Sequence, residues 1–335
     1  MDGLLVVDKT AGPTSHDIVA RARRALGQPR IGHTGTLDPM ASGVLPLVLG
    51  RATRLARFVS AGDKTYEAEI RFGIATDTYD AQGVQTAEHR GPMPSADDIE
   101  RALDAFRGTF MQRPPAHSAK KIGGTRSYTL ARAARLRPRA AGDAPDRTGG
   151  LDSLDPPAGA SPVSVMTRAI EIMRDDRDRP DGADGAGRRA GRDRIRVRVE
   201  CSAGFYVRSL AHDLGERLGV GAHLAALRRT RSGGFTLADA IGVASLELDP
   251  AAALKAVIPL AGMLPGLSSA ILTEAGERRV AHGLDLGAGD VQELRDGGEP
   301  GPAAGIRLID RRGDLLGIAE AAGTLGVLHP FVVLI

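Results

Sequence analysis

The chain has 335 residues, which is enough for roughly two domains with buried cores. Hydrophobic residues make up 42% and charged residues 25%, as is ordinary for a soluble globular protein. The single cysteine, Cys201, excludes an internal disulfide and any CxxC metal site, and no apolar run reaches membrane-spanning length. The N-terminus, MDGLLVVDK, does not resemble a signal peptide, so we expect a protein of the reducing cytoplasm.

The net charge of +3 is unevenly distributed along the chain. Residues 267–335 contain six arginines and ten acidic residues, so this part carries −4 and residues 1–266 carry +7. Residues 111–142 hold eight lysines and arginines and no acid. This concentration suggests a polyanionic partner, although a solvated basic loop accounts for the charge equally well.

The N-terminal region predicts a strand followed by a helix. Residues 3–9 are a short apolar run typical of a strand, and turn residues follow at 11–13. Thr14 or Ser15 can then cap a helix with one apolar face. The residues on that face are Ile18, Val19, Ala22 and Leu26.

The next elements are a half-exposed strand and a capped helix. Side chains alternate between apolar and polar over residues 66–72, which indicates a strand with one wet face. Ser95 and Asp98 form a capping-box pattern for a helix that Gly108 ends. The apolar residues facing inward on this helix are Ile99, Leu103 and Phe106.

Two segments look inserted. Residues 137–161 and 174–193 are rich in Pro, Gly, Ala, Asp and Arg and lack apolar periodicity, so they are interpreted as mobile surface insertions. The second insertion separates two strand patterns, residues 163–172 and 194–201. Together these patterns predict a hairpin with a long charged tip.

The last part of the chain predicts helices and then short strands. Tyr206 and Arg208 close a strand or turn, a leucine-striped helix runs to Gly219, and a second short helix is predicted over residues 222–229. Beyond Pro265 the pattern changes to β-like pieces with glycine-rich turns, which suggests a small β-barrel domain. The order of elements favours an α+β fold over alternating βαβ units. The β-like pieces are Ala270–Leu272, Ile306–Asp310, Leu315–Ala319 and Val332–Ile335.

The most informative segment is the loop within residues 32–50, GHTGTLDPMASGVLPLVLG. It combines a histidine, hydroxyls, glycines and a proline, and Asp38 is the only carboxylate between Asp17 and Asp63. Loops on a rigid scaffold are where chemistry tends to sit, so Asp38 is the candidate reactive group. On the residues alone, however, a structural role for Asp38 as an N-cap or Asx-turn residue before Pro39 carries the greater weight, roughly two-thirds.

Other polar candidates also have ordinary structural explanations. His33 alone suggests a turn or core histidine, Tyr66 a packing residue, and Tyr206 with Arg208 a strand-end pair. The sequence lacks GxxxxGK[ST], a strand-bound GxGxxG, HExxH and GxSxG, and its eight histidines have no metal-ligand spacing. We therefore expect no metal, nucleotide or nicotinamide cofactor.

Five blocks in order resemble the TruB family of bacterial tRNA pseudouridine synthases, which isomerise uridine 55 in the T loop. The loop extended to GHTGTLDPMASGVLPLVLGRATR resembles the family's catalytic signature. The blocks span residues 3–237, and the tail resembles the family's PUA-like domain. The other four blocks are LLVVDKTAGPTSHD, DKTYEAEIRFGIATDTYDAQG, QRPPAHSAKK and CSAGFYVRSLAHDLGERLGVGAHLAALRR.

The resemblance assigns roles residue by residue. It makes Asp38 the catalytic aspartate, Tyr66 the ring that stacks on the target uracil, and Arg208 the ion-pair partner of Asp38. Because a guanidinium can hold a carboxylate ionised, this pairing is physically reasonable. Whether Asp38 attacks the uracil ring, attacks the sugar or stabilises a glycal-type intermediate stays open. The expected RNA-binding residues are His33, Tyr206, Leu227, Lys9, Lys120 and Lys121.

The resemblance also implies a fold and a way of working. We expect a pseudouridine synthase fold over residues 1–262, with a mostly antiparallel or mixed sheet flanked by helices, and a PUA-like β-barrel over residues 263–335. The implied activity is cofactor-free isomerisation of a flipped uridine in the T-arm stem-loop of tRNA, by a monomer that needs no protein partner.

Three features of the chain qualify the resemblance. Residues 117–119 read His-Ser-Ala where many relatives have Tyr-Ser-Ala, so an aromatic contact with RNA is lost. The net charge of −4 over residues 267–335 argues against strong independent binding of RNA by the C-terminal domain. The alternative function is a tRNA-binding or folding factor in which catalysis is secondary, while a guide-dependent relative acting on ribosomal RNA is disfavoured by the bacterial-type motifs.

Overall fold

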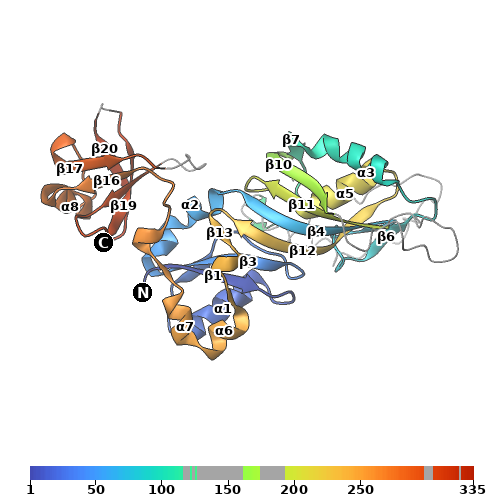
Figure 1. The fold of residues 1–335 in the computed structure, drawn as a ribbon, viewed down its shortest axis with the longest axis horizontal. Helices are drawn as coiled ribbons and strands as arrows, with labels where there is room; N and C mark the ends of the chain where they lie inside the picture. The colour runs from blue at the N-terminus through green and yellow to red at the C-terminus, as the bar shows by residue number, and fades with distance from the viewer. Residues whose placement is uncertain (116–120, 123–124, 127–160, 174–192, 298–304, 324–325) are drawn as a thin grey trace. The chain divides into compact units, whose positions relative to one another are not determined.

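The computed structural model describes residues 1–115, 121–122, 125–126, 161–173, 193–297, 305–323 and 326–335 (Figure 1). These residues form two compact units, one of residues 1–64 with 229–335 and one of residues 65–228. The boundary expected between residues 262 and 263 stays a prediction. Within the described ranges, no helix is long and apolar enough to cross a membrane.

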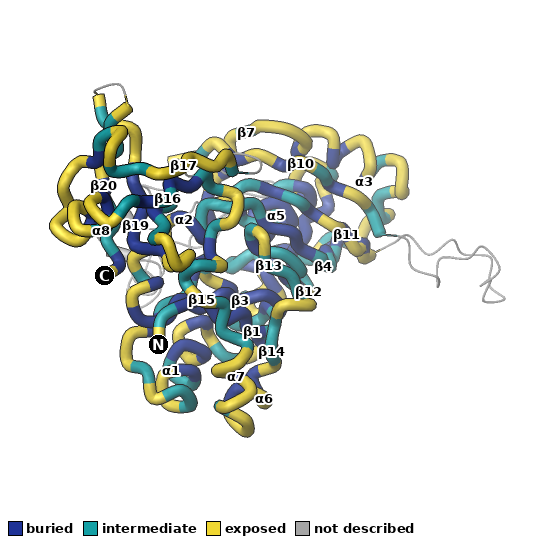
Figure 2. The backbone as a smooth tube through the Cα atoms, turned by 60° about the vertical axis from the view of Figure 1, so that its left-hand side comes forward, coloured by how far each residue is buried: buried dark blue, intermediate teal, exposed yellow. Residues whose placement is uncertain are grey.

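The first unit is built on an apolar N-terminal sheet. Its central strands are β1 (Gly3–Lys9) and β3 (Ser42–Leu49), which pair antiparallel along their length. The strand order is β14-β1-β3-β12, with short strands added beside β1, β3 and β12. Both central strands are buried on both faces (Figure 2), as their almost unbroken apolar sequences predict. The other strands here are β2 (Ile31–His33), β12 (Ala222–Ser232), β13 (Phe235–Thr236), β14 (Ile241–Gly242) and β15 (Ile258–Pro259).

Helix α1 (Ser15–Leu26) begins where the sequence predicted. Thr14 caps it, and Thr14 and Asp17 complete a capping box in which each side chain binds the other residue's backbone. Ile18, Val19 and Ala22 of its apolar stripe are buried as expected, whereas Leu26 in the last turn is only partly buried. Gly27 ends the helix in the left-handed conformation that glycine tolerates. The other helices of this unit are α2 (Ala56–Ala61), α6 (Val243–Leu248), α7 (Pro250–Lys255) and α8 (Glu274–Ala281), with the 3₁₀ turn η1 (Gly50–Leu55) before α2.

The C-terminal residues form a separate five-stranded sheet in the order β17-β16-β18-β19-β20. The expected strands near residues 270, 306, 315 and 332 are present, whereas α8 and β17 were not predicted. The expected PUA-like barrel is not confirmed, because no strand pairing within the described residues joins β17 to β20. The strands are β16 (Ser269–Leu272), β17 (Val291–Arg295), β18 (Ile306–Ile309), β19 (Leu315–Ala321) and β20 (Leu328–Val333).

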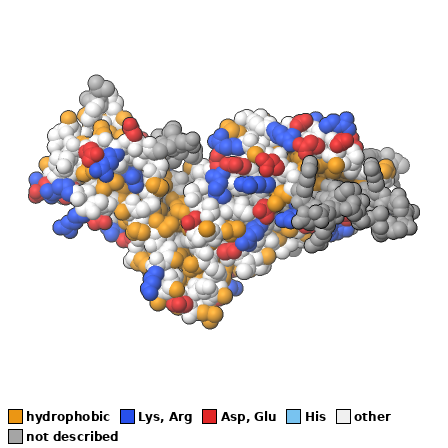
Figure 3. Space-filling model, in the orientation of Figure 1, with side chains coloured by type: hydrophobic (Ala, Val, Ile, Leu, Met, Phe, Trp, Pro, Cys, Tyr) orange, Lys and Arg blue, Asp and Glu red, His pale blue; other side chains and the backbone are white. Residues whose placement is uncertain are grey.

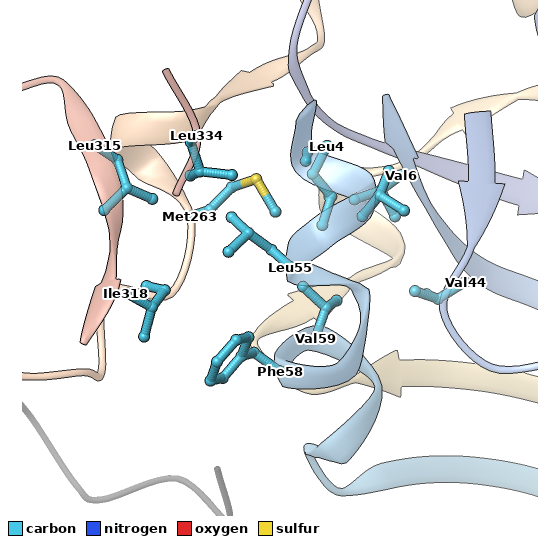
Figure 4. Close-up of a cluster of buried hydrophobic side chains, with 12 residues drawn as sticks. Leu4, Val6, Val44, Leu55, Phe58, Val59, Met263, Leu315, Ile318 and Leu334 are labelled. Atoms are coloured by element: carbon cyan, nitrogen blue, oxygen red, sulfur yellow. The ribbon is translucent and has the colours of Figure 1, made fainter. Parts of the chain in front are cut away.

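One apolar cluster joins the C-terminal sheet to the N-terminal sheet (Figure 4). Leu4 and Val6 of β1 and Leu55 of η1 belong to the same buried group as Leu315 and Leu334. Burial of this surface holds the C-terminal strands against the N-terminal part of the first unit, since removal of apolar area from water is the main stabilising term in folding.

A row of arginines supplements this contact at its edge. Arg51 donates from Nη1 to the carbonyl of Leu334 at 2.5 Å, and Arg54 donates to the carbonyl of Val333. The guanidinium of Arg57 lies 4.6 Å from the ring centroid of Phe331. The spacing of three residues places the arginines along one side of η1 and α2, facing the end of the chain.

The second unit is a mostly antiparallel sheet in the order β12-β4-β11-β10-β7. Strand β4 alternates as predicted, with its apolar side chains buried, and β10 and β11 form the predicted hairpin. Its strands are β4 (Lys64–Phe72), β5 (Ile74–Thr76), β6 (Gln85–Glu88), β7 (Gly108–Gln112), β8 (Lys121–Ile122), β9 (Thr125–Arg126), β10 (Val163–Met173) and β11 (Arg194–Cys201). Its helices are α3 (Ala96–Leu103), capped by Ser95 and Asp98 and followed by the 3₁₀ turn η2 (Asp104–Phe106), and α5 (Val207–Arg217).

The helix predicted over residues 222–229 is wrong, because these residues lie in strand β12. Ala, Leu and Arg are good helix formers, but here backbone pairing with neighbouring strands and burial outweigh that intrinsic preference. His223 and Leu224 are almost fully buried. The expected strand or turn ending at Arg208 is also corrected, since Tyr206 is the N-cap of α5 and Arg208 lies in its first turn.

The two insertions expected at residues 137–161 and 174–193 lie almost entirely outside the described residues. The departure at residues 117–119 and the predicted RNA-binding residue Lys120 also fall outside them. Lys121 is described only through its backbone, which pairs with Arg126 between β8 and β9.

Candidate active site

The loop that carries Asp38 connects the antiparallel strands β2 and β3 in the first unit. The backbone amide of Ala41 donates to the carbonyl of Asp38 at 3.0 Å, so residues 38–41 form a tight turn. Pro39 lies within this turn, as expected from the sequence. Gly35 has a positive φ of 99° on the approach to Asp38. Asp38 itself is only partly buried, which leaves its carboxylate at the surface of a rigid scaffold.

A buried lysine lies beneath this turn. Lys9, at the end of β1, is fully buried, and its Nζ donates to the carbonyls of Ala41 at 2.6 Å and Asp38 at 3.1 Å. The carbonyls of Thr10 and Pro39 lie within 3.3 Å of the same nitrogen. An ammonium has three hydrogens, so it can bind several backbone carbonyls of one turn at once. Lys9 therefore fixes the backbone of the Asp38 loop.

Burial also changes the acidity of Lys9. Removal from water, together with the nearby charge of Arg229, lowers the pKa of Lys9 to about 8. The carboxylates of Asp38 and Asp17 act in the opposite direction and raise the same pKa. The charge of Lys9 is thus linked electrostatically to the charge of the candidate catalytic aspartate.

A second buried cation holds both ends of the loop. Arg229, in β12, is 1% exposed, and it donates from Nε to the carbonyl of Val44 at 2.7 Å and from Nη2 to the carbonyl of Gly35 at 3.0 Å. Its backbone lies so close to Gly43 that a Cβ there would be 2.1 Å from the Arg229 oxygen. Gly43, with φ of 104°, is therefore required for this approach.

Helix α1 supplies a third attachment. The hydroxyl of Ser15 donates to the carbonyl of Leu37 at 3.0 Å and accepts from its amide at 2.9 Å. The amide of Gly12 donates to the carbonyl of Pro39 at 2.8 Å. The backbone on both sides of Asp38 is consequently held by hydrogen bonds from β1, α1 and β12.

His33 lies at the end of β2, at the start of the same loop. Its ring packs edge-on against His16 of α1, with the ring centroids 5.2 Å apart. Asp38, Lys9 and His33 therefore belong to one structural region, as their predicted roles require. The proposed contact of His33 with RNA stays a prediction.

Four further predicted site residues, Tyr66, Tyr206, Arg208 and Leu227, lie in the second unit. Tyr66 lies near the start of β4 and Leu227 in β12, and both are more than nine-tenths buried. Tyr206 caps α5, and its backbone is held by the buried side chain of Gln112, which donates to the Tyr206 carbonyl at 3.0 Å and accepts from its amide at 2.8 Å. Gln112 thus fixes the start of the helix that carries Arg208.

Arg208 makes a buried ion pair with Asp80. Nη1 of Arg208 lies 3.5 Å from Oδ2 of Asp80 and donates to the carbonyl of Thr78 at 3.2 Å. Asp80 is itself 5% exposed and accepts hydrogen bonds from the hydroxyl of Thr78 and the amide of Gln82. Buried charges are costly unless paired and hydrogen-bonded, and this pair is both.

Asp80, Gln112 and Arg229 were not identified from the sequence. Each lies inside one of the five blocks that resemble the TruB family, and this location was the only feature of the sequence that could have marked it as functional. Nothing in the spacing of these polar residues singled them out, because their roles depend on neighbours distant in sequence. The predicted pairing of Arg208 with Asp38 joins residues of the two units and stays a prediction.

Several exposed arginines among the described residues of the second unit pair with acidic neighbours. Where Figure 1 shows α3, β7 and β10, Figure 3 shows basic and acidic side chains intermixed. Arg194 and Arg196 of β11 pair with Glu69 and Glu67 of β4, and Arg107 pairs with Glu100. No group of three or more His, Cys, Asp or Glu side chains within the described ranges is placed to hold a metal ion.

Comparison with known proteins agrees with the five blocks. Residues 23–143 match the TruB family pseudouridylate synthase N-terminal domain, and residues 208–258 match the tRNA pseudouridylate synthase B C-terminal domain. The tRNA pseudouridine synthase B of Solibacter usitatus is 38% identical over all of both chains. That of Heliobacterium modesticaldum is 39% identical over 96% of this chain and 91% of its own.

Solved structures show the same fold. A Cbf5-Nop10-Gar1 complex contains a chain that superposes with a TM-score of 0.67 and 25% identity, covering 99% of this chain and 85% of that one. A chain of an H/ACA RNP bound to a substrate RNA superposes with a TM-score of 0.66 and 24% identity, covering the same shares of both chains. These likenesses confirm a fold of mixed sheets and helices.

The burial of Lys9 predicts a specific pH dependence of stability. Between pH 8 and 10.5 the folded state releases this proton while the unfolded state keeps it, so the contribution of Lys9 to stability rises with pH across this window. Urea denaturation at several pH values measures the free energy of unfolding of wild type and of Lys9→Met. As the pH rises from 8 to 10.5, we expect this free energy to increase for wild type relative to Lys9→Met. A constant difference from pH 8 to 10.5 would contradict the lowered pKa.

Proposed function

The chain belongs to the TruB family of pseudouridylate synthases, and on this premise we propose that it converts uridine 55 in the T loop of tRNA to pseudouridine. Relatives that match almost the whole chain at 38% and 39% identity are named tRNA pseudouridine synthase B. The enzyme is accordingly an isomerase that forms pseudouridine in tRNA. That the modified uridine is the one at position 55, in the T arm, is our proposal for this chain.

The arrangement of the Asp38 loop carries the proposal. Isomerisation breaks the bond from C1′ of the ribose to N1 of uracil and forms a bond from C1′ to C5, while the hydrogen on C5 is lost and N1 gains one. A carboxylate can act on such a substrate only if it stays ionised and is held close to the reacting atoms. Lys9, Arg229 and Ser15 supply that rigidity through the backbone of the loop.

The catalytic residues that we propose are Asp38, Tyr66 and Arg208. Asp38 acts as the carboxylate, Tyr66 stacks on the detached uracil, and Arg208 pairs with Asp38 and keeps it ionised. The buried aromatic face of Tyr66 and the apolar side chain of Leu227 suit a flipped base, because a base outside its stack is held by aromatic and apolar surfaces. Tyr206 and His33 are proposed to contact the RNA, together with Lys120 and Lys121. Lys9, also expected to bind RNA, is fully buried and supports the Asp38 loop from beneath instead.

The proposed substrate is the T-arm stem-loop, recognised by the shape of its folded loop and by its unstacked bases. We propose that the enzyme works in the cytoplasm without a protein partner and without a cofactor. The relatives named as synthases favour this function over the alternative of a tRNA-folding factor in which catalysis is secondary. The C-terminal sheet has a net negative charge, and we propose that it orients the tRNA.

Replacement of Asp38 by Asn tests the catalytic role. Asp38→Asn keeps the size of the side chain but removes its charge, so we expect pseudouridine formation on an unmodified tRNA transcript to be abolished while tRNA affinity stays near that of wild type. Chemical mapping of pseudouridine and filter binding measure the two quantities. The control Asp97→Asn makes the same change at an exposed carboxylate in α3 and should be fully active. Full activity of Asp38→Asn would refute the mechanism.

Replacement of Arg208 by Lys tests the need for a guanidinium. Arg208 contacts Asp80 and the Thr78 carbonyl together, whereas the single ammonium of a lysine cannot reproduce that planar geometry. We expect the single-turnover rate to fall by at least about tenfold, or about 1.4 kcal/mol in activation free energy. Arg217→Lys, an exposed change in the last turn of α5, is the control. Near-normal turnover of Arg208→Lys would count against its role.

A further inference from the structure

The loop between β5 and β6 contacts α5 at two points. Asp80 pairs with Arg208, and the preceding residue, Tyr79, stacks on His212 with the ring centroids 3.8 Å apart and the planes 7° from parallel. Arg208 and His212 are four residues apart on α5, so they lie on one face of the helix, one turn apart. Two consecutive loop residues thus meet two consecutive turns of one helix.

The backbone of Tyr79 is in an unusual conformation. Its φ is 65°, a left-handed value that residues other than glycine, Asn and Asp seldom adopt. In this conformation the carbonyl of Tyr79 accepts from the amide of Leu224 in β12 at 2.9 Å, and the amide of Ala81 donates to the carbonyl of Leu224 at 2.9 Å. These two hydrogen bonds fix the backbone on both sides of Asp80, whose carboxylate pairs with Arg208. A strained residue persists only where its surroundings hold it, and such residues gather at functional sites.

The ring of His212 is suited to this stacking. Burial lowers the pKa of His212 to about 4, so the imidazole is neutral at physiological pH. Its Nδ1 is buried and has no hydrogen-bond partner within the described part of the chain. The neutral ring stacks flat on Tyr79 with no charge to desolvate.

We propose that Tyr79 and His212 are positioning residues for the reaction: their stack holds Asp80 in place, and Asp80 in turn orients the guanidinium of Arg208. The inference rests on the proposed catalytic role of Arg208. A glycine at position 79 would leave the backbone free to move, whereas the stacked ring of Tyr79 holds it in one conformation. Loss of the stack frees the loop, so Arg208 samples orientations that do not serve the reaction.

The test compares variants that keep and remove the stack. His212→Ala and Tyr79→Gly remove it, the latter without the strain at position 79, whereas His212→Phe retains a flat neutral ring. We expect the single-turnover rate at saturating tRNA to fall by about tenfold in the first two variants and to stay within about threefold in His212→Phe, with tRNA affinity unchanged in all three. The exposed His282→Ala is the matched control.

A double-mutant cycle separates positioning from general destabilisation. If the stack acts through Asp80, His212→Ala should slow the reaction in wild type but cause little further loss in an Asp80→Asn background. Additive losses, or wild-type rates in both His212→Ala and Tyr79→Gly, would overturn the inference. These outcomes differ from failure of the proposed function, in which wild type forms no pseudouridine or Arg208→Lys is fully active.

Discussion

The candidate site depends on two buried cations that bind backbone carbonyls. Lys9 and Arg229 are almost fully buried, and they donate hydrogen bonds to main-chain oxygens of residues 10 and 35–44. Carbonyl groups of an irregular loop cannot pair in a sheet, and leaving them unpaired inside a protein costs about 1–3 kcal/mol each. The two cations satisfy these groups and so allow a loop full of turns to be rigid. The carboxylate of Asp38 can then stay at the surface while its backbone is fixed from below.

The second unit follows the same principle with different groups. There the amide of Gln112 holds the backbone of Tyr206, and Asp80 holds the guanidinium of Arg208. In each case a buried polar side chain, contributed by a distant segment, fixes a residue with a proposed role in the reaction. Preorganised polar groups of this kind cost no rearrangement at the moment of reaction, which is how enzymes obtain much of their rate. The TruB family membership and the geometry therefore support one account.

The sequence predicted the regular elements well where patterns are local. The capping boxes at Thr14 and Ser95 and the alternation along β4 are confirmed, because caps and periodicity depend on residues close in the chain. The helix over residues 222–229 failed because strand pairing, a long-range effect, decides that segment. Asp80 and Gln112 were missed for the same reason. Asp38 was identified because its loop is chemically unusual and its neighbours resemble a known family.

The most direct test of the buried-cation account is the single-turnover rate of Lys9→Met with tRNA bound. Methionine has nearly the length and volume of lysine but cannot donate to the carbonyls of Asp38 and Ala41. If the loop depends on these bonds, the rate of pseudouridine formation falls by at least about tenfold while tRNA affinity is retained. A wild-type rate in this variant, with the protein folded, would contradict the claim that buried cations hold the catalytic loop.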